Sequence, residues 1–505
     1  MKILVINSPA YFLKYDRNRQ FSYGRFGCSD PIPHELGGRY ATAVKDHYVP
    51  YPWALGYASA LLKRDSRHQI KALDCQAQDF SEEDFAELVE DFLPDVLVFD
   101  LPTITFEFCM ELIKPLKKKF GFKLILVGLH ASGLPRETMR DYPAVDYVIK
   151  NDYGLQLLKF AKYNFDPKKA DRVPLLFYRQ GKRILASKAE MKWIPFDDLP
   201  YPDREDLLMD QYHDLEVMGK PTIHLVTSRS CPFTCSYCNV RVFFPQGFYW
   251  KRSIKSVIEE MEFLKEKMGA NQLYFDDDIM THDQKWMINF SKEILKKGLK
   301  IPWSLMGDIN LKEETIKMMV KAGACGMKFG VESINPKTLK NITKTWVSKE
   351  KVYNFVKMAK KHGLWLHGDF IVGIPGDNRE SMEEMIKYAI DLDLNTAQIY
   401  SAQPLPGTPF YQQAVKNKWL VAKKWDEYDG NYLSPVSYPD FPKEEIEEML
   451  RKFKTEWEMA AVKKFVQQPW RLLRYARGRG IPYTLKKIIT VLKKGRKDHL
   501  YIAGT

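Results

Sequence analysis

The stretch Cys231-Pro232-Phe233-Thr234-Cys235-Ser236-Tyr237-Cys238 decides how this chain is interpreted. It places three cysteines in the spacing CxxxCxxC, directly after a strand-like apolar run at residues 223–227. Three thiolates from one short loop can hold three irons of a 4Fe–4S cluster and leave the fourth iron open to a ligand. A structural zinc site usually has paired CxxC motifs and four ligands, and no second pair accompanies this loop. The spacing therefore predicts an iron–sulfur cluster with one open iron.

The cysteine loop resembles the signature of the radical SAM superfamily, whose usual form CPxxCxYC is matched by Pro232 and Tyr237. The resemblance implies that Cys231, Cys235 and Cys238 bind the cluster and that the open iron chelates S-adenosylmethionine (SAM). One electron from the cluster would then split SAM and generate a 5′-deoxyadenosyl radical. The resemblance also implies that Tyr237 packs near the adenine of SAM.

Strand-like and helical segments alternate from about residue 221 to 415. Strands are expected at residues 223–227, 272–275, 301–305, 327–331, 366–372 and 397–401. The helix expected at residues 253–268 has one apolar stripe, with Ser253 to cap its start and Gly269 to end it. Six such units predict a partial (β/α)6 TIM-type barrel, open and parallel. Function would lie at the C-terminal ends of its strands.

Polar segments follow those strand ends and resemble the matching superfamily segments. They are residues 276–278, 329–333, 373–377 and 403–408. Three adjacent carboxylates repel one another, and the alternating ligands of an EF-hand are missing, so neither a purely structural role nor calcium binding is favoured. The resemblance implies that Asp277 and Asp278 bind the methionine moiety of SAM, that Glu332 binds its ribose, and that the backbone at Gly373 and Pro375 lines its adenine. Ser333 is expected to contact SAM as well. One position departs, because Asp308 ends the third strand where relatives often carry arginine.

The first 160 residues form a second α/β unit. Strands are expected at residues 3–7, 70–74, 96–99, 124–128 and 147–150, with helices at 53–63, 81–92 and 106–120. This alternation predicts a doubly wound, Rossmann-like parallel sheet, which binds ligands at the carboxyl ends of its strands.

The same unit resembles the cobalamin-binding domain that precedes many radical SAM domains. The match rests on the segments at residues 51–57, 94–98 and 127–132. Cobalamin would then lie between this unit and the barrel, beside Pro9, Pro52, Thr103, Gly128, Leu129, His130 and Ser132. The DxHxxG motif of other cobalamin proteins is absent and His130 sits in a different loop, so we do not expect His130 to ligate cobalt. A Rossmann-like scaffold that binds no cofactor stays an alternative.

These patterns predict four regions: a cobalamin-binding-like domain at 1–160, a linker strap at 161–220, the barrel at 221–425 and a helical basic region at 426–505. The chain has a net charge of +13, and residues 463–505 hold twelve Lys or Arg and one acid, Asp498. Aliphatic and aromatic residues interleave these charges, a pattern typical of a helix on an anionic membrane surface. RNA binding and packing on the barrel are the alternatives.

Composition also bears on location. Seven cysteines, three of them assigned to iron, disfavour a secreted disulfide scaffold. The N-terminus lacks a signal-peptide pattern, and the longest uncharged apolar stretch, residues 48–62, is too short to span a bilayer. A cytoplasmic protein with peripheral membrane contact is expected.

The branch that looks nearest is the cobalamin-type radical SAM enzymes of lipid and isoprenoid modification, the hopanoid branch above all. The resemblance implies methylation, cyclisation or rearrangement at an unactivated carbon of a lipid or other small molecule, with an electron donor such as flavodoxin or ferredoxin. The alternative is an RNA-modifying methylthiotransferase, which needs a second cluster on three N-terminal cysteines; Cys28, Cys75 and Cys109 are present. Cys109 falls inside an expected helix and suits a packed apolar position, so nucleic acid is not the expected partner.

Overall fold

The structure, a computed structural model, describes residues 1–9, 11–16, 19–23, 30–33, 50–78, 80–212, 221–245 and 247–467. These residues form two compact units. The first holds the described parts of 1–212 together with 228–256 and 403–429, and the second holds 221–227, 257–402 and 430–467. The cysteine loop therefore belongs to the first unit, although the strand that leads into it belongs to the second.

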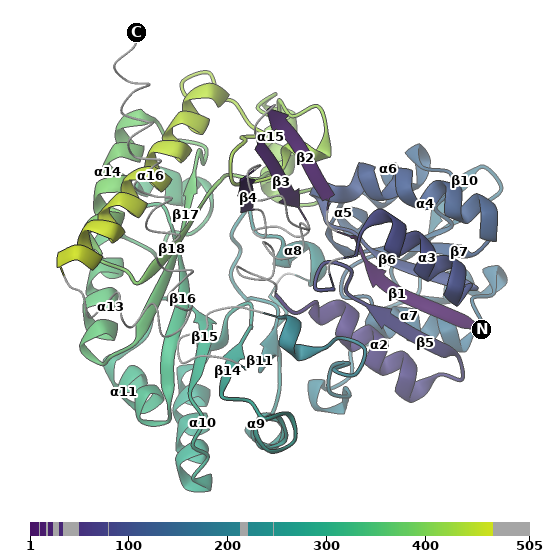
Figure 1. The fold of residues 1–505 in the computed structure, drawn as a ribbon, viewed down its shortest axis with the longest axis horizontal. Helices are drawn as coiled ribbons and strands as arrows, with labels where there is room; N and C mark the ends of the chain where they lie inside the picture. The colour runs from purple at the N-terminus through teal and green to yellow at the C-terminus, as the bar shows by residue number, and fades with distance from the viewer. Residues whose placement is uncertain are drawn as a thin grey trace. The chain divides into compact units, whose positions relative to one another are not determined.

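The first unit is built on a seven-stranded sheet in the order β10-β9-β8-β7-β6-β1-β5 (Figure 1). Its strands are β1 (Lys2–Asn7), β5 (Gln69–Leu73), β6 (Val96–Asp100), β7 (Lys123–Val127), β8 (Tyr147–Ile149), β9 (Leu176–Gln180) and β10 (Arg183–Ala186). Five of these strands are parallel, and they lie across the sheet in the order β5, β1, β6, β7, β8. When they are numbered by their order along the chain, this arrangement is 2-1-3-4-5. That order is one of the two common doubly wound arrangements, and its switch point lies between β1 and β6.

Helices cover both faces of this sheet. They are α2 (Trp53–Asp65), α3 (Glu82–Phe92), α4 (Phe106–Phe120), α5 (Gly128–Gly133), α6 (Pro135–Asp141) and α7 (Gly154–Lys162). Leu4 and Leu97 share one core cluster with Phe85 of α3 and Met110 of α4. Helices α2 and α7 pack on each other, and α2 also contacts β1 and β5. The predicted doubly wound sheet is confirmed.

Two parts of the first unit were not predicted. Strands β9 and β10 form a hairpin that joins the sheet antiparallel to β8, within the segment read from the sequence as a linker. Strands β2 (Tyr11–Asp16), β3 (Arg19–Tyr23) and β4 (Asp30–Pro33) form a separate three-stranded antiparallel sheet. Neither has the strict apolar alternation by which the longer strands were recognised.

The second unit is built on six strands in chain order, β11-β14-β15-β16-β17-β18, and every neighbouring pair is parallel. They are β11 (Thr222–Leu225), β14 (Gln272–Phe275), β15 (Trp303–Gly307), β16 (Ala324–Glu332), β17 (Trp365–Val372) and β18 (Thr396–Ser401). All six fall within a few residues of the predicted strands, which confirms the partial (β/α)6 barrel.

The connecting helices flank this sheet (Figure 1). They are α9 (Ile254–Met268), α10 (Gln284–Lys297), α11 (Glu313–Lys321), α12 (Pro336–Asn341), α13 (Lys349–Lys361) and α14 (Arg379–Asp391), followed after β18 by α16 (Lys443–Gln467). Ser253 caps α9 by accepting from the Ser256 N–H at 3.1 Å, and Gly269 has a φ of 67°, as predicted.

Large apolar side chains fasten the sheet to its helices. Phe275 and Trp303 both contact Phe290 of α10, Phe329 contacts Phe355 of α13, and Phe370 contacts Phe453 of α16. Because side chains alternate along a strand, the residues between these face the opposite side of the sheet. No helix in the described part of the chain is long and apolar enough to cross a membrane. The predicted basic segment at 463–505 begins in the last turn of α16, and its residues from 468 on lie outside the described residues.

Candidate active site

The cysteine loop is closed at its base by a short antiparallel ladder. Strand β12 (Ser228–Arg229) pairs with β13 (Trp250–Lys251) just before Cys231. Within the loop, the Cys238 N–H donates to the Cys235 carbonyl at 3.2 Å, and Arg241 of α8 (Val240–Phe243) donates to the Thr234 carbonyl at 3.0 Å. One backbone hydrogen bond and the Arg241 side chain thus help to hold the shape of the loop.

The three cysteines fit an iron–sulfur cluster by chemistry and spacing, since thiolates are the usual ligands of such clusters. Cys235 is buried, whereas Cys231 and Cys238 are partly exposed, as is Tyr237. Within the described residues, no three His, Cys, Asp or Glu side chains converge closely enough to form a ready-made metal site.

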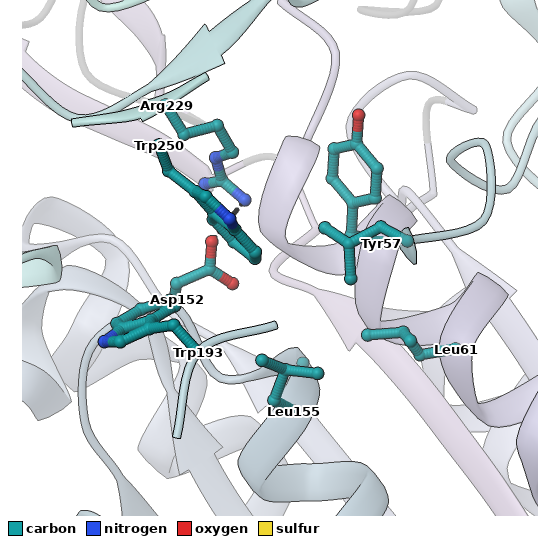
Figure 2. A pocket seen from close by; sticks show the side chains of 9 residues that line it. Tyr57, Leu61, Asp152, Leu155, Trp193, Arg229 and Trp250 are labelled. Carbon is teal, nitrogen blue, oxygen red and sulfur yellow. Dashed lines mark ion pairs between the residues drawn. The ribbon is translucent and has the colours of Figure 1, made fainter. Parts of the chain in front are cut away.

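An ion pair supports the base of this loop. Arg229, two residues before Cys231, pairs with Asp152, and both side chains are nearly buried. The guanidinium also lies over the rings of Phe244 at 5.3 Å and Tyr57 at 5.9 Å. Figure 2 shows Arg229 and Asp152 facing each other among the aromatic side chains that line a small pocket. That pocket has room for about one water molecule, so it is not a substrate site.

Asp277 anchors Thr227, the last residue of the second unit before the cysteine loop. Both of its carboxylate oxygens accept from the Thr227 N–H, at 3.0 and 3.1 Å, and Oδ1 also accepts from the Thr227 hydroxyl at 2.7 Å. Asp277 is 2% exposed, whereas Asp278 is exposed. Asp277 therefore has a positioning role that the sequence did not reveal, because Thr227 lies 50 residues away.

Glu332 lies at the end of β16 with a φ of 61°, after a break in strand register between Gly330 and Glu332. Its Oε1 accepts from Lys344 Nζ at 2.8 Å, while its Oε2 is buried and has no hydrogen-bond partner among the described residues. A buried acceptor of this kind suits a hydroxyl donor of a ligand, as the predicted contact with ribose requires. Ser333, also buried, instead accepts from the Asn335 N–H at 3.1 Å.

Hydrogen bonds from other parts of the second unit hold the segment that follows β17. Asp377 accepts from the Thr338 hydroxyl at 2.8 Å and from the Ile374 N–H at 2.9 Å. Tyr438 donates to the Gly373 carbonyl at 2.8 Å, and Asn341 donates to the Pro375 carbonyl at 2.6 Å. Gly373 and Pro375 are buried. Asp277, Glu332 and Gly373 thus follow three parallel strands at the same edge of the sheet, as predicted.

In the first unit, the predicted cobalamin residues follow β1, β6 and β7. Pro9 is buried, and Ser8 beside it accepts from the Thr105 hydroxyl at 3.2 Å across the switch point. Thr103 is buried, and within the described part of the chain its hydroxyl oxygen has no hydrogen-bond partner. Switch points are where doubly wound sheets bind ligands, so this unsatisfied atom fits a polar group of a cofactor. Pro52 precedes α2 and is partly exposed.

Residues 128–132 form helix α5 and not an open loop. Gly128 has a φ of 89°, and an added Cβ would collide with the Asp100 carboxylate. The glycine is therefore required by the chain itself, whatever the cofactor does. Ser132 accepts from the Asn151 N–H at 3.0 Å, and Leu129 is partly exposed.

His130 is a packed histidine. Its ring stacks on Phe106 with a centroid distance of 3.8 Å and meets Trp425 edge-on at 4.8 Å. Burial lowers the pKa of His130 to about 3, so the imidazole is neutral at physiological pH. His130 is therefore a buried, neutral ring that packs between Phe106 and Trp425.

One segment ties the two predicted cofactor regions of the first unit together. Phe410, in α15 (Pro409–Lys416), donates its N–H to the Ser236 carbonyl of the cysteine loop at 3.0 Å. A Cβ on Gly407 would lie 2.8 Å from the Gly133 Cα, at the end of α5, and 3.3 Å from Val242 of α8. The segment after β18 therefore packs between the cysteine loop and α5.

The other described cysteines do not suit a second cluster. Cys75 and Cys109 are fully buried in the core of the first unit. Burial raises the pKa of the Cys109 thiol to about 12 and that of Cys75 well above its ordinary value. Thiols of this kind are poor metal ligands, because the thiolate is the binding form. Cys28 lies outside the described residues.

Comparison with known proteins agrees with this architecture. Residues 225–389 match the radical SAM superfamily, and residues 41–153 match the B12 binding domain. An uncharacterised methyltransferase of Pyrococcus horikoshii is 30% identical over 405 residues, which cover 79% of this chain and 86% of that protein. The chain belongs to the cobalamin-binding radical SAM family.

Two further matches extend the comparison. The cytidylyl-2-hydroxyethylphosphonate methyltransferase of Streptomyces wedmorensis is 23% identical, over 84% of this chain and 89% of that protein. The structure of the cobalamin-dependent SAM radical enzyme OxsB has the same fold, with a TM-score of 0.67 and 13% identity over 98% of this chain and 71% of that chain. The chain is thus an enzyme of the cobalamin-type radical SAM class, with SAM, a 4Fe–4S cluster and cobalamin as its cofactors.

Sequence reasoning missed Lys344, Arg229, Asp152 and Asp377 as supporting residues. Lys344 bonds the predicted site residue Glu332. Arg229 and Asp152 pair with each other beside the cysteine loop, and Asp377 bonds Ile374 in the segment that holds Gly373 and Pro375. The one signal available was placement. Asp152 follows a predicted strand, and Arg229 directly precedes the cysteine loop.

Proposed function

We propose that this enzyme transfers a methyl group from methylcobalamin to an unactivated carbon of a small molecule. When bound, the cluster and SAM supply the one-electron chemistry that removes a hydrogen atom, and cobalamin supplies the methyl group. The protein's part is to hold these groups and exclude water. The proposal rests on one observation: the cysteine loop, α5 and the segment after β18 pack together in the same compact unit. Cyclisation or rearrangement without methyl transfer is the second candidate.

We assign cluster binding to Cys231, Cys235 and Cys238, and SAM binding to Tyr237, Asp277, Asp278, Glu332, Ser333, Gly373 and Pro375. We assign cobalamin binding to Pro9, Pro52, Thr103, Gly128, Leu129 and Ser132. His130 is assigned to the same site as a packed side chain that lines it. The electron donor would be a small redox protein such as flavodoxin or ferredoxin. The proposed regions are those of the sequence: 1–160, 161–220, 221–425 and 426–505.

A lipid or isoprenoid substrate remains a proposal. Its support is similarity to the hopanoid C-3 methylase of Methylococcus capsulatus, 22% identical over 384 residues, together with the basic, apolar composition of residues 463–505. Membrane docking by that segment is likewise a proposal. Co-sedimentation of the full chain with anionic vesicles, against a chain that ends at Val462, tests it; equal pelleting of both would reject it.

The test of function is anaerobic purification with cobalamin, followed by incubation with methyl-labelled SAM and a cell extract. The variant Cys231→Ala/Cys235→Ala/Cys238→Ala should lose the iron and form no 5′-deoxyadenosine. Cys325→Ala is the matched control, since Cys325 lies on β16 and its thiol donates to the Trp303 carbonyl at 3.3 Å. Wild type that holds corrinoid and labels a product supports methyl transfer. Full turnover without bound corrinoid would reject it.

A further inference from the structure

The segment that follows α15 packs on the predicted cobalamin residues of the first unit. It includes the short 3-10 helix η7 (Trp425–Glu427) and Tyr428, and it belongs to that same unit. Helix η7 contacts α4 and the 3-10 helix η2 (Thr103–Thr105), which directly precedes α4. A stretch of chain that comes after the barrel strands thus lies against the connection that follows β6, beside the switch point of the doubly wound sheet.

Ring contacts connect this segment to α5 and α4. The ring of Trp425 meets His130 edge-on at a centroid distance of 4.8 Å, and it lies 5.3 Å from the ring of Tyr428. His130 also stacks on Phe106 at 3.8 Å. Phe106 begins α4 one turn after Thr103, whose carbonyl accepts the Phe106 N–H. These contacts bring Thr103, His130 and Tyr428 into one neighbourhood.

Each of these three side chains carries a polar atom without a hydrogen bond. Thr103 is 3% exposed, and His130 and Tyr428 are each 2% exposed. The Thr103 hydroxyl, the His130 Nδ1 and the Tyr428 hydroxyl are buried, and none has a hydrogen-bond partner among the described residues. A buried polar atom without a partner is unfavourable, and native proteins contain only a few. Three in one neighbourhood therefore indicate that a ligand supplies the missing partners.

The charge of the neighbourhood favours an uncharged polar ligand group. Burial lowers the pKa of His130 to about 3 and raises the pKa of Tyr428, so both rings are neutral at physiological pH, as is the hydroxyl of Thr103. Glu107 of α4 and Asp426 of η7 lie close to each other here, and burial raises the pKa of both carboxyls. An anionic group would gain no opposite charge from the three side chains, and these two acids would repel it.

We propose that Tyr428 is a further cobalamin-binding residue, and that its hydroxyl donates to an amide side chain of the corrin ring. A primary amide both donates and accepts hydrogen bonds, so such amides also match the Thr103 hydroxyl and the His130 ring. Trp425 acts as a positioning residue, because its ring holds Tyr428 beside His130. The proposal rests on the proposed function, since Thr103 and His130 are assigned there to the cobalamin site.

The first measurement is cobalamin affinity. The full chain, purified without corrinoid and with its cluster reconstituted, is titrated with hydroxocobalamin, and the change in corrinoid absorbance gives Kd. Tyr428→Phe removes the hydroxyl and keeps the ring against Trp425, so its Kd should rise about 3- to 10-fold, the effect of one lost hydrogen bond. Tyr147→Phe is the matched control and should keep the wild-type Kd, because Tyr147 begins β8 and packs on Phe160. A Kd for Tyr428→Phe within about twofold of wild type overturns the proposal.

The stability of the corrinoid-free protein separates a ligand contact from a structural one. Because the Tyr428 hydroxyl has no partner among the described residues, Tyr428→Phe should leave the urea midpoint unchanged or raise it. A lower midpoint would show that the hydroxyl is bonded within the protein or to water, and it would overturn the proposal.

Cobinamide, which keeps the corrin amides and lacks the nucleotide tail, locates the contact. Tyr428→Phe should weaken the binding of cobinamide by the same factor as that of hydroxocobalamin. An effect confined to hydroxocobalamin would place the hydroxyl at the nucleotide tail and overturn the assignment to an amide. Wild type that binds neither corrinoid rejects the cobalamin site and this inference together, whereas normal corrinoid binding without a methylated product rejects methyl transfer alone.

Discussion

Lys344 Nζ donates to Glu332 Oε1 at 2.8 Å and to the Gly330 carbonyl at 2.8 Å, and both side chains are nearly buried. Gly330 leaves the space for this pair, because an added Cβ would lie 2.9 Å from Nζ. The lysine comes from the connection between α12 and α13. It therefore holds Glu332 in its left-handed conformation with the second carboxylate oxygen available to a ligand.

Lys344→Met is expected to destabilise the apo protein by about 3 kcal/mol, because a buried carboxylate loses its partner. The double variant Lys344→Met/Glu332→Gln should recover much of this loss, since no uncompensated charge remains. Urea unfolding measures both effects, and calorimetry with S-adenosylhomocysteine should show weaker binding for both variants. Unchanged stability of the single variant would contradict the buried pair.

The bond between Asp277 and Thr227 is expected to order the cysteine loop. Asp277→Ala should cost about 1–3 kcal/mol, because the buried Thr227 N–H is left without its acceptor. Thr227→Val is the matched change, as it removes the hydroxyl and keeps the N–H and the shape. A double-mutant cycle by chemical denaturation, with iron content after reconstitution as the second readout, measures the coupling. If the stability losses of the two single variants simply add in the double variant, Asp277 and Thr227 are not coupled and the prediction is wrong.

Asp377 is expected to make stability depend on pH. Burial raises its pKa to about 7, above the ordinary value near 4, so between these values the folded chain holds a proton that the unfolded chain has released. Its contribution to stability is therefore complete below about pH 4 and is lost as the pH rises to about 7. Asp377→Asn should remove this contribution to the pH dependence of the free energy of unfolding, which is a few kcal/mol at most. The measurement is the free energy of unfolding against pH, and parallel curves for wild type and variant from pH 4 to 8 would contradict this prediction.

Breaking the ion pair of Arg229 and Asp152 should destabilise the protein more than replacing both residues by apolar ones. Asp152→Asn leaves a buried guanidinium without its counter-charge, which costs about 3–5 kcal/mol, whereas Arg229→Met/Asp152→Leu should cost less. The surrounding rings of Tyr57 and Phe244 would pack on the methionine. Thermal unfolding and iron content after reconstitution test this order. An Asp152→Asn variant as stable as wild type would contradict it.

Sequence reasoning was accurate where structure is local. The six barrel strands, the five parallel strands of the first sheet and the caps of α9 follow from periodicity and from residues a few positions apart. The cysteine loop was recognised from eight consecutive residues. The hairpin β9–β10 was missed because its strands are short and only partly buried, so their sequence lacks the strict alternation of a core strand.

The sequence alone determined the class of this protein, because cluster ligands and strand or helix periods are set by residues that are neighbours along the chain. Tertiary structure decided which residues support them. Asp277 meets Thr227 across 50 positions, and Lys344 meets Glu332 from a separate connection. Such contacts depend on the path of the whole chain, and no short-range pattern records them.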